Sequence, residues 1–402
     1  MTENLPAYPM ERARKCPFDP APALRQVDRI ARVRIWNGET PWLVTDYELQ
    51  RSVLTDQRFS SDVRKPGYPV SSAAVSVQRD GVPPFVLMDN PDHDARRRML
   101  TGKFMVKRVE AMRPRVQQIV DGFIDRMLAR ARPVDLVSEF ALPVPLSVIC
   151  ELLGVPYADH EFFHRVSTVL ASSTATQDDA LGAARELGEY LHRLVEAKDA
   201  QPGDDVISAL VVEQMRTARL SRDEVVTMAM LILSGGHETT ANMIALGTAA
   251  LLEHPDQLAD LRATDDPQVV AGAVEELLRY LSIVHSGLRR TAIEDVEVGG
   301  KLVRRGEGVI LALEAGNRTG RVFPGLPDPD RLDIRHPVRH HQAFGFGVHQ
   351  CLGQALARME LQVVYGTLYR RIPTLRLATP IEDVAFKHDS IIYGVHSLPV
   401  TW

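Results

Sequence analysis

The sequence contains few cysteines, and their spacing excludes two classes of cross-linked protein. Among 402 residues only Cys16, Cys150 and Cys351 are cysteines. They lie far apart, their number is odd, and no Cys-x-x-Cys pair occurs. Disulfide scaffolds and structural zinc sites need several cysteines at suitable spacings, so neither is encoded here. We expect a protein of the reducing cytoplasm.

Lysine is also scarce, and basic residues do not dominate the chain. There are 7 lysines and 40 arginines, and 52 acidic residues bring the formal net charge to −5. A nucleic-acid-binding protein normally has a basic domain with a clustered basic stripe. The charge balance therefore argues against nucleic acid as a partner. The excess of arginine over lysine is most simply explained by genomic composition bias.

No segment is long and apolar enough to cross a membrane. The longest apolar run, Val225 to Leu233, is far shorter than the ~20 residues that a membrane-spanning helix needs. The first residues, MTENLPAYPMERARKCPFDP, carry an acid, prolines and charges where a signal peptide has a basic flank and an apolar core. We therefore expect a soluble, cytoplasmic protein that contacts no membrane.

Helical periodicity dominates the chain and strand patterns lie near its ends. A prior of roughly 100–200 residues per domain suggests two or three domains. However, no Ser/Gly linker and no internal repeat divides the sequence. Helical spacing runs from about Asp92 to Leu281, whereas β-rich regions are predicted near residues 30–46, 290–315 and 380–402. We predict one mainly α domain with small β-sheets, spanning residues 1–402.

Turn residues place the individual strands. Asn37-Gly38 and Gly299-Gly300 are typical hairpin turns, and another pair of strands is predicted around Tyr393-Gly394. The predicted strands around the first two turns are Val33–Trp36, Trp42–Thr45, Val296–Val298 and Lys301–Val303, and Val309–Leu313 follows.

One helix should cross the whole molecule. Ser221 and Glu224 form a capping box, and no proline follows until Pro255, so we predict a helix from Arg222 to about Glu253, roughly 48 Å long. Gly235 and Gly236 in its middle cost about 1 kcal/mol each relative to alanine. The two glycines could admit a flat ligand to the helix backbone, or they could permit close packing of another helix.

A glycine-rich loop with one cysteine is the strongest local signal. The segment Phe344-Gly-Phe-Gly-Val-His-Gln-Cys-Leu-Gly353 leads directly into the helix-forming run Gln354–Gln362. Backbone N–H groups and the positive end of a helix would favour the thiolate of Cys351, and a thiolate can ligate iron. The glycines allow the backbone to approach a flat cofactor, and His349 could reach its charged edge. Cys16 and Cys150 are interpreted as small, buried hydrophobic residues.

At these residues the chain resembles a cytochrome P-450, a haem-thiolate monooxygenase of the soluble bacterial type, as found in actinobacterial secondary metabolism and xenobiotic oxidation. The resemblance implies haem b (iron protoporphyrin IX) between the long central helix and the cysteine loop, with Cys351 as the iron ligand and Gly353 beside the cofactor. Gly235-Gly-His-Glu-Thr239 matches the family's oxygen-activation motif, which implies proton relay by Glu238 and Thr239.

The resemblance also implies two sets of supporting residues. Glu276 and Arg279, three apart on one helix face, match the family's buried Glu-x-x-Arg pair, which Arg331 would brace from the loop before the cysteine. Two departures from the family's pattern are a longer segment from Val322 to Arg331 and Gly316 where alanine is expected. The residues matching those that hold the haem propionates are His93, Arg97, Arg290 and His349.

We predict an enzyme that inserts one oxygen atom from O2 into a C–H bond or double bond of a hydrophobic small molecule, by hydroxylation or epoxidation. The alternatives are a peroxide-driven peroxygenase and a non-catalytic haem sensor or carrier. The expected electron donors are a ferredoxin and its NAD(P)H-dependent reductase, because no flavin motif and no further cysteine cluster is present. A monomer is expected.

Two residue sets follow from this prediction. A basic face for an acidic ferredoxin could comprise Arg96, Arg98, Lys103, Lys107, Arg108, Arg113 and Arg358, which could equally be solvated surface charges. The substrate-pocket candidates, which could also be ordinary core residues, are Val86, Leu87, Leu231, Gly235, Val284, Ile391 and Ile392.

Overall fold

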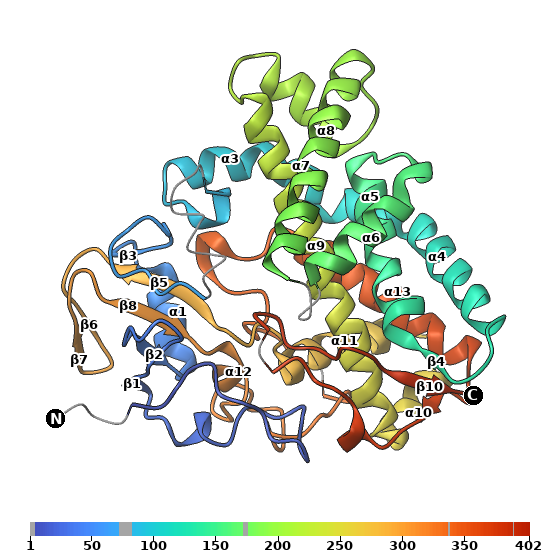
Figure 1. Cartoon of the computed structure of the whole chain (residues 1–402). Coiled ribbons are helices and arrows are strands. Elements are labelled where there is room, and N and C mark those ends of the chain that lie inside the picture. Colours follow the sequence, from blue (N-terminus) through green and yellow to red (C-terminus); the bar gives the residue numbers. More distant parts are fainter. Residues whose placement is uncertain (1–4, 72–82, 172–175, 337, 389) are drawn as a thin grey trace.

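The computed structural model describes residues 5–71, 83–171, 176–336, 338–388 and 390–402. Helices make up most of it, as Figure 1 shows, and the prediction of a mainly α fold with small sheets is confirmed. The α-helices are α1 (Tyr47–Thr55), α3 (Asp92–Thr101), α4 (Val106–Leu128), α5 (Pro143–Leu153), α6 (His160–Ala171), α7 (Gln177–Ala200), α8 (Val206–Leu210), α9 (Arg222–Leu252), α10 (Pro255–Ala263), α11 (Pro267–Leu281), α12 (Leu313–Gly316) and α13 (Gln354–Arg371).

The strands form three small sheets. A five-stranded sheet has the order β1-β2-β8-β5-β3, in which β2 and β8 are parallel and the other pairs antiparallel. A second sheet has the order β4-β10-β9, and β6 pairs with β7. The strands are β1 (Ile30–Arg32), β2 (Trp42–Val44), β3 (Phe59–Ser60), β4 (Val134–Asp135), β5 (Leu288–Ala292), β6 (Val296–Val298), β7 (Lys301–Val303), β8 (Gly308–Leu311), β9 (Arg376–Leu377) and β10 (Pro399–Thr401).

Strand positions agree with the turn-based predictions in some places and differ in others. The hairpin β6–β7 turns at Gly299-Gly300 as predicted. The first strand is Ile30–Arg32, not Val33–Trp36, because Arg34 pairs instead with Ala7 of the N-terminal segment. Around Tyr393-Gly394 the described residues form only the single bridge between Phe386 and Val395, so the predicted strand pair is wrong there.

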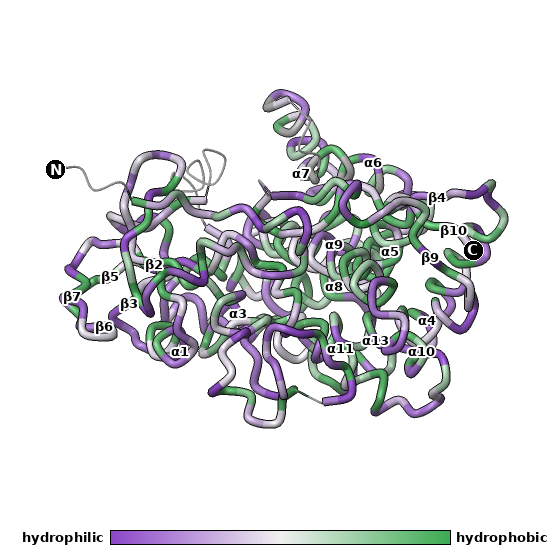
Figure 2. Tube along the Cα trace, turned by 90° about the horizontal axis from the view of Figure 1, so that it is seen from below, coloured by the Kyte–Doolittle hydropathy of each residue, from purple (hydrophilic) through white to green (hydrophobic). Residues whose placement is uncertain are grey.

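Helix α9 is the centre of the helical part. It begins at Arg222 behind the predicted Ser221–Glu224 capping box, whose two hydrogen bonds are both present, and ends at Leu252. Every residue from Thr240 to Leu251 is buried, as expected for a helix that is surrounded by other helices. Its main neighbours are α5, α7 and α13. Figure 2 shows hydrophobic segments concentrated where α5 and α9 meet.

No helix within the described residues combines the length and the hydrophobicity that a membrane span requires.

Candidate functional site

A large cavity lies between α9, the start of α13 and the loop that precedes α13. It contains about 1400 Å³ of space not filled by protein atoms, counted to its open mouth. Gly235 and Thr239 of α9 line one wall, and Cys351 and Gly353 line another. The structure thus brings together two motifs that are more than a hundred residues apart in the sequence.

The cysteine loop is shaped by glycines with left-handed backbone conformations. Gly345 has φ +71° and Gly347 has φ +74°, which residues with a side chain rarely adopt. A Cβ on Gly347 would also lie 2.7 Å from the carbonyl oxygen of Leu54. The loop closes where the N–H of Cys351 donates to the carbonyl of Phe344 at 2.9 Å. Cys351 is consequently presented to the cavity at the start of α13.

The three cysteines differ in their surroundings. Cys16 is exposed, so the expectation that it is buried is wrong. Cys150 is buried, and burial raises its pKa to about 12, so its thiol stays protonated. Burial raises the pKa of Cys351 too, although the N–H groups of Gly353 and Gln354 and the guanidinium of Arg97 lower it. The predicted donors are therefore present, but the protein alone does not favour the thiolate. A metal cation bonded to the sulfur would supply the missing stabilisation.

The predicted propionate ligands gather beside the cysteine loop. The rings of His93 and His349 are in contact, with centroids 4.0 Å apart and planes tilted by 39°. Arg97 donates to the carbonyl of Gln350 at 2.7 Å, and buried Arg290 donates to the carbonyl of Arg289 at 2.7 Å. His349 and Arg97 line the cavity directly, and His93 is in contact with His349.

Among the described residues, none of these four side chains forms an ion pair with a carboxylate, although Asp89 and Asp94 lie near enough to act on their pKa values. His93 Nε2 and His349 Nδ1 are buried and have no hydrogen-bond partner. Burial, together with the neighbouring Arg290, His93 and Arg97, lowers the pKa of His349 to about 3. Because buried polar groups are normally paired, such a cluster fits the two carboxylates of a porphyrin.

The cavity has no multidentate metal site among the described residues. In the described part of the chain, no group of three or more His, Cys, Asp or Glu side chains is arranged to hold a metal ion. A single cysteine facing a large cavity fits an iron whose other ligands come from the porphyrin. The residues present therefore fit haem.

The two glycines of the α9 motif have different roles. A Cβ on Gly236 would lie 2.7 Å from Cδ1 of Ile149, so this glycine permits close packing of α5. Gly235 lines the cavity, and a Cβ there would meet nothing within 4 Å. Gly236 lines the cavity as well, so access for a ligand applies to both glycines and close packing applies to Gly236.

The acid and alcohol of the motif follow directly on α9. The hydroxyl of Thr239, which lines the cavity, donates to the carbonyl of Gly235 at 2.6 Å. Burial raises the pKa of Glu238, although the nearby ammonium of Lys387 opposes this. Glu238 is half-buried, so it is shielded from bulk water but remains able to exchange protons.

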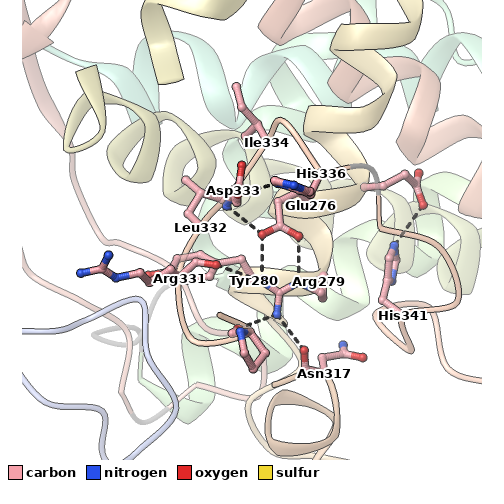
Figure 3. Close-up of polar contacts among 12 residues, drawn as sticks. Glu276, Arg279, Tyr280, Asn317, Arg331, Leu332, Asp333, Ile334, His336 and His341 are labelled. Carbon is pink, nitrogen blue, oxygen red and sulfur yellow. Dashed lines mark hydrogen bonds and ion pairs between the residues drawn. The ribbon is translucent and has the colours of Figure 1, made fainter. Parts of the chain in front are cut away.

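Glu276 and Arg279 form a fully buried pair on α11. The Arg279 guanidinium donates to both Glu276 oxygens at 2.8 Å, as Figure 3 shows. It also donates to the carbonyls of Asn317, Pro329 and Arg331. All five N–H groups of Arg279 are thereby used. The pair fixes the segment that leads to the cysteine loop.

The predicted contribution of the Arg331 side chain is wrong. Only the Arg331 carbonyl joins the network, and its side chain is 84% exposed beside Asp328. In Figure 3 its guanidinium points away from the pair. Arg318, which was not singled out, is the buried arginine of this region, and it donates to the carbonyls of Tyr280 and Phe18.

Gly316, a departure from the expected pattern, has a packing reason. A Cβ on Gly316 would lie 2.2 Å from Oε1 of Gln50. Gln50 is fully buried and donates to the carbonyls of Val44 and Ala312. The glycine therefore makes room for a glutamine that joins α1 to the sheet.

A second ion cluster ties α11 and α13 to the same loop segment. Glu275 accepts hydrogen bonds from Arg358 at 2.6 and 3.0 Å and lies 3.0 Å from Nε2 of His341. Burial raises the pKa of Glu275, but His341 and Arg358 outweigh burial and lower it to about 2. Because the folded-state pKa lies below the ordinary value of 4.5, the cluster stabilises the fold above pH 4.5.

We expect Glu275→Gln to lower the free energy of unfolding at pH 7 by on the order of 2–3 kcal/mol. The stabilisation is lost as the pH falls from 4.5 towards 2. The difference in free energy of unfolding between variant and parent should therefore become smaller over that range. Urea denaturation at pH 7, 5 and 3 measures this gap. Glu297→Gln, at an exposed position on β6, is the control. A gap that does not change with pH would refute the assignment.

The seven residues predicted to line a substrate pocket are divided between the cavity and other parts of the structure. Four of the seven line the cavity, namely Val86, Leu231, Gly235 and Val284. Leu87 instead packs against Val63, Tyr68 and Val70, Ile391 is 42% exposed at the surface, and Ile392 packs against the main core. Lining residues that were not predicted include Phe85, Phe104, Ile149, Ile283, Leu288 and Leu313.

Comparisons with known proteins agree with this site. A family model described as Cytochrome P-450 matches residues 160–373. Cytochrome P-450 GfsF of Streptomyces halstedii is 49% identical over 404 residues, covering 100% of this chain and 97% of that protein. A vitamin D3 dihydroxylase of Streptomyces griseolus is 46% identical over 405 residues, covering 100% and 98%.

Solved structures of similar proteins match the fold of this chain. The crystal structure of GfsF matches with a TM-score of 0.94, covering 99% of this chain and 100% of that one at 49% identity. The crystal structure of MoxA from Nonomuraea recticatena matches with a TM-score of 0.92, covering 98% of both chains at 50% identity.

The fold and the site thus define an oxidoreductase built around a haem iron. The chain belongs to the cytochrome P-450 family, and its relatives are bacterial members of the actinobacterial type. It is a haem-thiolate monooxygenase.

Proposed function

We propose that this enzyme binds haem b through Cys351 and oxygenates a hydrophobic small molecule, with electrons from a ferredoxin and its NAD(P)H-dependent reductase. The observation that carries the proposal is that one cavity is lined by Cys351 on one wall and Thr239 on the other. Bound haem supplies the activation of O2, which the side chains alone cannot perform.

The residues of this chain bind the cofactor and donate protons and hydrogen bonds. Cys351 binds the iron, Gly353 lies beside the cofactor, and the propionates pair with His93, Arg97, Arg290 and His349. The Thr239 hydroxyl donates a hydrogen bond to the Gly235 carbonyl at 2.6 Å. Its oxygen can therefore accept a hydrogen bond from the cavity side. Glu238, whose pKa is raised by burial, is the proton source behind it.

The cavity walls support a hydrophobic substrate. Beyond the cysteine and threonine, the lining is mostly aliphatic and aromatic, including Phe85, Leu231 and Ile283. Relatives include the vitamin D3 dihydroxylase of Streptomyces griseolus and a pentalenic acid synthase of Streptomyces avermitilis, 46% identical to this chain. We infer that hydroxylation of a compact, mainly hydrocarbon natural product or xenobiotic is the activity to test first.

Most of the basic residues proposed to bind a ferredoxin form ion pairs with carboxylates of the same chain. Arg96 pairs with Glu224 at 2.7 Å and Arg358 pairs with Glu275 at 2.6 Å. Four other candidates also have carboxylate partners, namely Arg98, Lys103, Arg108 and Arg113. A ferredoxin that docks here therefore has to rely on partly compensated charges, and its binding should weaken with salt.

Turnover under two regimes separates the proposal from its alternatives. The purified holoenzyme is incubated with a panel of hydrophobic compounds, first with O2, NADPH, ferredoxin and reductase, and then with hydrogen peroxide alone. We expect oxygenated product in the first regime. Product with peroxide only would favour a peroxygenase, and no product under either regime would favour a sensor or carrier.

Thr239→Ala should uncouple electron consumption from oxygenation. Without the hydroxyl, we expect product per NADPH consumed to fall by about 100-fold, the lower end of what a positioned proton-transfer group contributes. The electrons should appear as hydrogen peroxide, which a peroxidase assay measures. Thr248→Ala, on the same helix and bonded to Tyr369 away from the cavity, is the matched control. Unchanged coupling in Thr239→Ala would remove this residue from the mechanism.

A further inference from the structure

Lys387 is a buried cation that the mechanism above does not use. All seven lysines lie in the described part of the chain, and among them only Lys387 is buried, with 6% of its surface exposed. Burying a lysine is costly unless a partner compensates its charge. The position of this residue therefore needs an explanation.

An asparagine connects Lys387 to α9 beside Glu238. Lys387 Nζ donates to Oδ1 of Asn242 at 3.3 Å. Asn242, one helical turn after Glu238, donates through Nδ2 to the Glu238 carbonyl at 2.9 Å. The asparagine side chain is thus fixed at both ends, and it holds the lysine against the turn that carries the proposed proton donor.

The C-terminal segment is built to keep Lys387 in place. The N–H of Lys387 donates to the carbonyl of Gly394 at 2.9 Å, and Phe386 stacks on Tyr393 with centroids 5.8 Å apart. A Cβ on Gly394 would lie 1.7 Å from Oδ1 of Asn242, so only glycine lets the segment approach α9 this closely. The segment and the helix therefore form one fixed contact.

Lys387 and Glu238 are also electrostatic partners. Burial lowers the pKa of Lys387, and Glu238 is the charged group that opposes this effect. Burial raises the pKa of Glu238, and Lys387 is the charged group that opposes it. Among the described residues, no other charged group from α9 or from the C-terminal segment contributes to either effect.

We propose that Lys387, tethered by Asn242 to the turn of α9 that carries Glu238, is a positioning residue whose charge sets how readily Glu238 releases a proton. This rests on the proposed proton relay. Each turnover consumes two protons, because one oxygen atom of O2 enters the product and the other leaves as water. Glu238 passes on both protons, one after the other, and regains each from solvent. The ferredoxin supplies the two electrons, and the Lys387 ammonium stays protonated throughout.

The direct test is an infrared titration of the Glu238 carboxyl group in the holoenzyme. The protonated carboxyl band is isolated by difference from Glu238→Gln, and its loss is followed against pH. We expect Lys387→Met to shift this titration to higher pH, because the cation that favours the carboxylate is gone. Lys387→Arg should restore the parent curve. Lys198→Met, which breaks a lysine–Asp205 pair remote from the cavity, should leave the curve unchanged.

A curve for Lys387→Met that coincides with that of the parent would overturn the proposal. If that variant does not fold, Lys387→Gln removes the charge while keeping a donor for Asn242, and the same comparison applies. Coupled turnover in Lys387→Met should fall about tenfold, less than the ~100-fold or more of a proton-transfer group itself. The infrared shift does not depend on turnover, so a failure of the monooxygenase proposal would be seen separately.

Discussion

Cys351→Ala should abolish oxygenation completely. Cys351 is the proposed iron ligand and lines the cavity, and electron donation from a thiolate ligand is what favours cleavage of the O–O bond in this family. The propionate contacts that we propose for His93, Arg97, Arg290 and His349 would not involve the sulfur, so part of the haem should remain bound. Product yield and the ratio of haem to protein measure the two effects.

The exposed Cys16 provides the matched control. Cys16→Ser should retain both haem and turnover, because this residue lies on the surface and does not line the cavity. Coupled turnover with O2 in Cys351→Ala would mean that another residue ligates the iron, and the site as described would be wrong.

Arg279→Met should have the largest effect on stability. The substitution removes the cation beside the buried Glu276 carboxylate. That carboxylate then keeps the hydrogen bond from the Asp333 N–H, at 3.0 Å. Breaking a buried ion pair by removing one partner costs about 3–5 kcal/mol, a large part of a typical domain's total stability. We expect a matching loss in denaturant unfolding, together with poor haem retention, because the pair also holds the Asn317, Pro329 and Arg331 carbonyls.

Arg331→Met tests whether the Arg331 side chain or only its backbone carbonyl supports the Glu276–Arg279 pair. Its guanidinium is 84% exposed, and an exposed ion pair contributes only ~0–1 kcal/mol. We therefore expect nearly parental stability. A loss as large as that of Arg279→Met would restore the original prediction that the Arg331 side chain braces the pair.

Local patterns made much of the molecule predictable from its sequence. The extent of α9 followed from a capping box and a downstream proline, and the hairpin at Gly299-Gly300 followed from its turn residues. Cys351 stood out because glycines, a histidine and a helix start surround it within ten residues. Each of these signals depends on neighbours in the sequence, so the sequence alone contains the information.

Contacts between distant segments could not be predicted in this way. Gln50 explains Gly316, and Gly394 fits only against Asn242, yet no local pattern connects either pair. Lys387 looks like an ordinary surface lysine until the fold places it beside Glu238. The errors at Arg331, Leu87 and Ile391 have the same origin, because the direction of a side chain in an irregular segment depends on what packs against it.

We propose that Cys351 binds haem iron as a thiolate. The most direct test is the absorption spectrum of the purified, dithionite-reduced holoprotein under carbon monoxide. The structure predicts the strongly red-shifted Soret band of a thiolate-ligated haem, which should disappear in Cys351→Ala. A Soret band like that of a histidine-ligated globin in the parent protein would contradict the assignment.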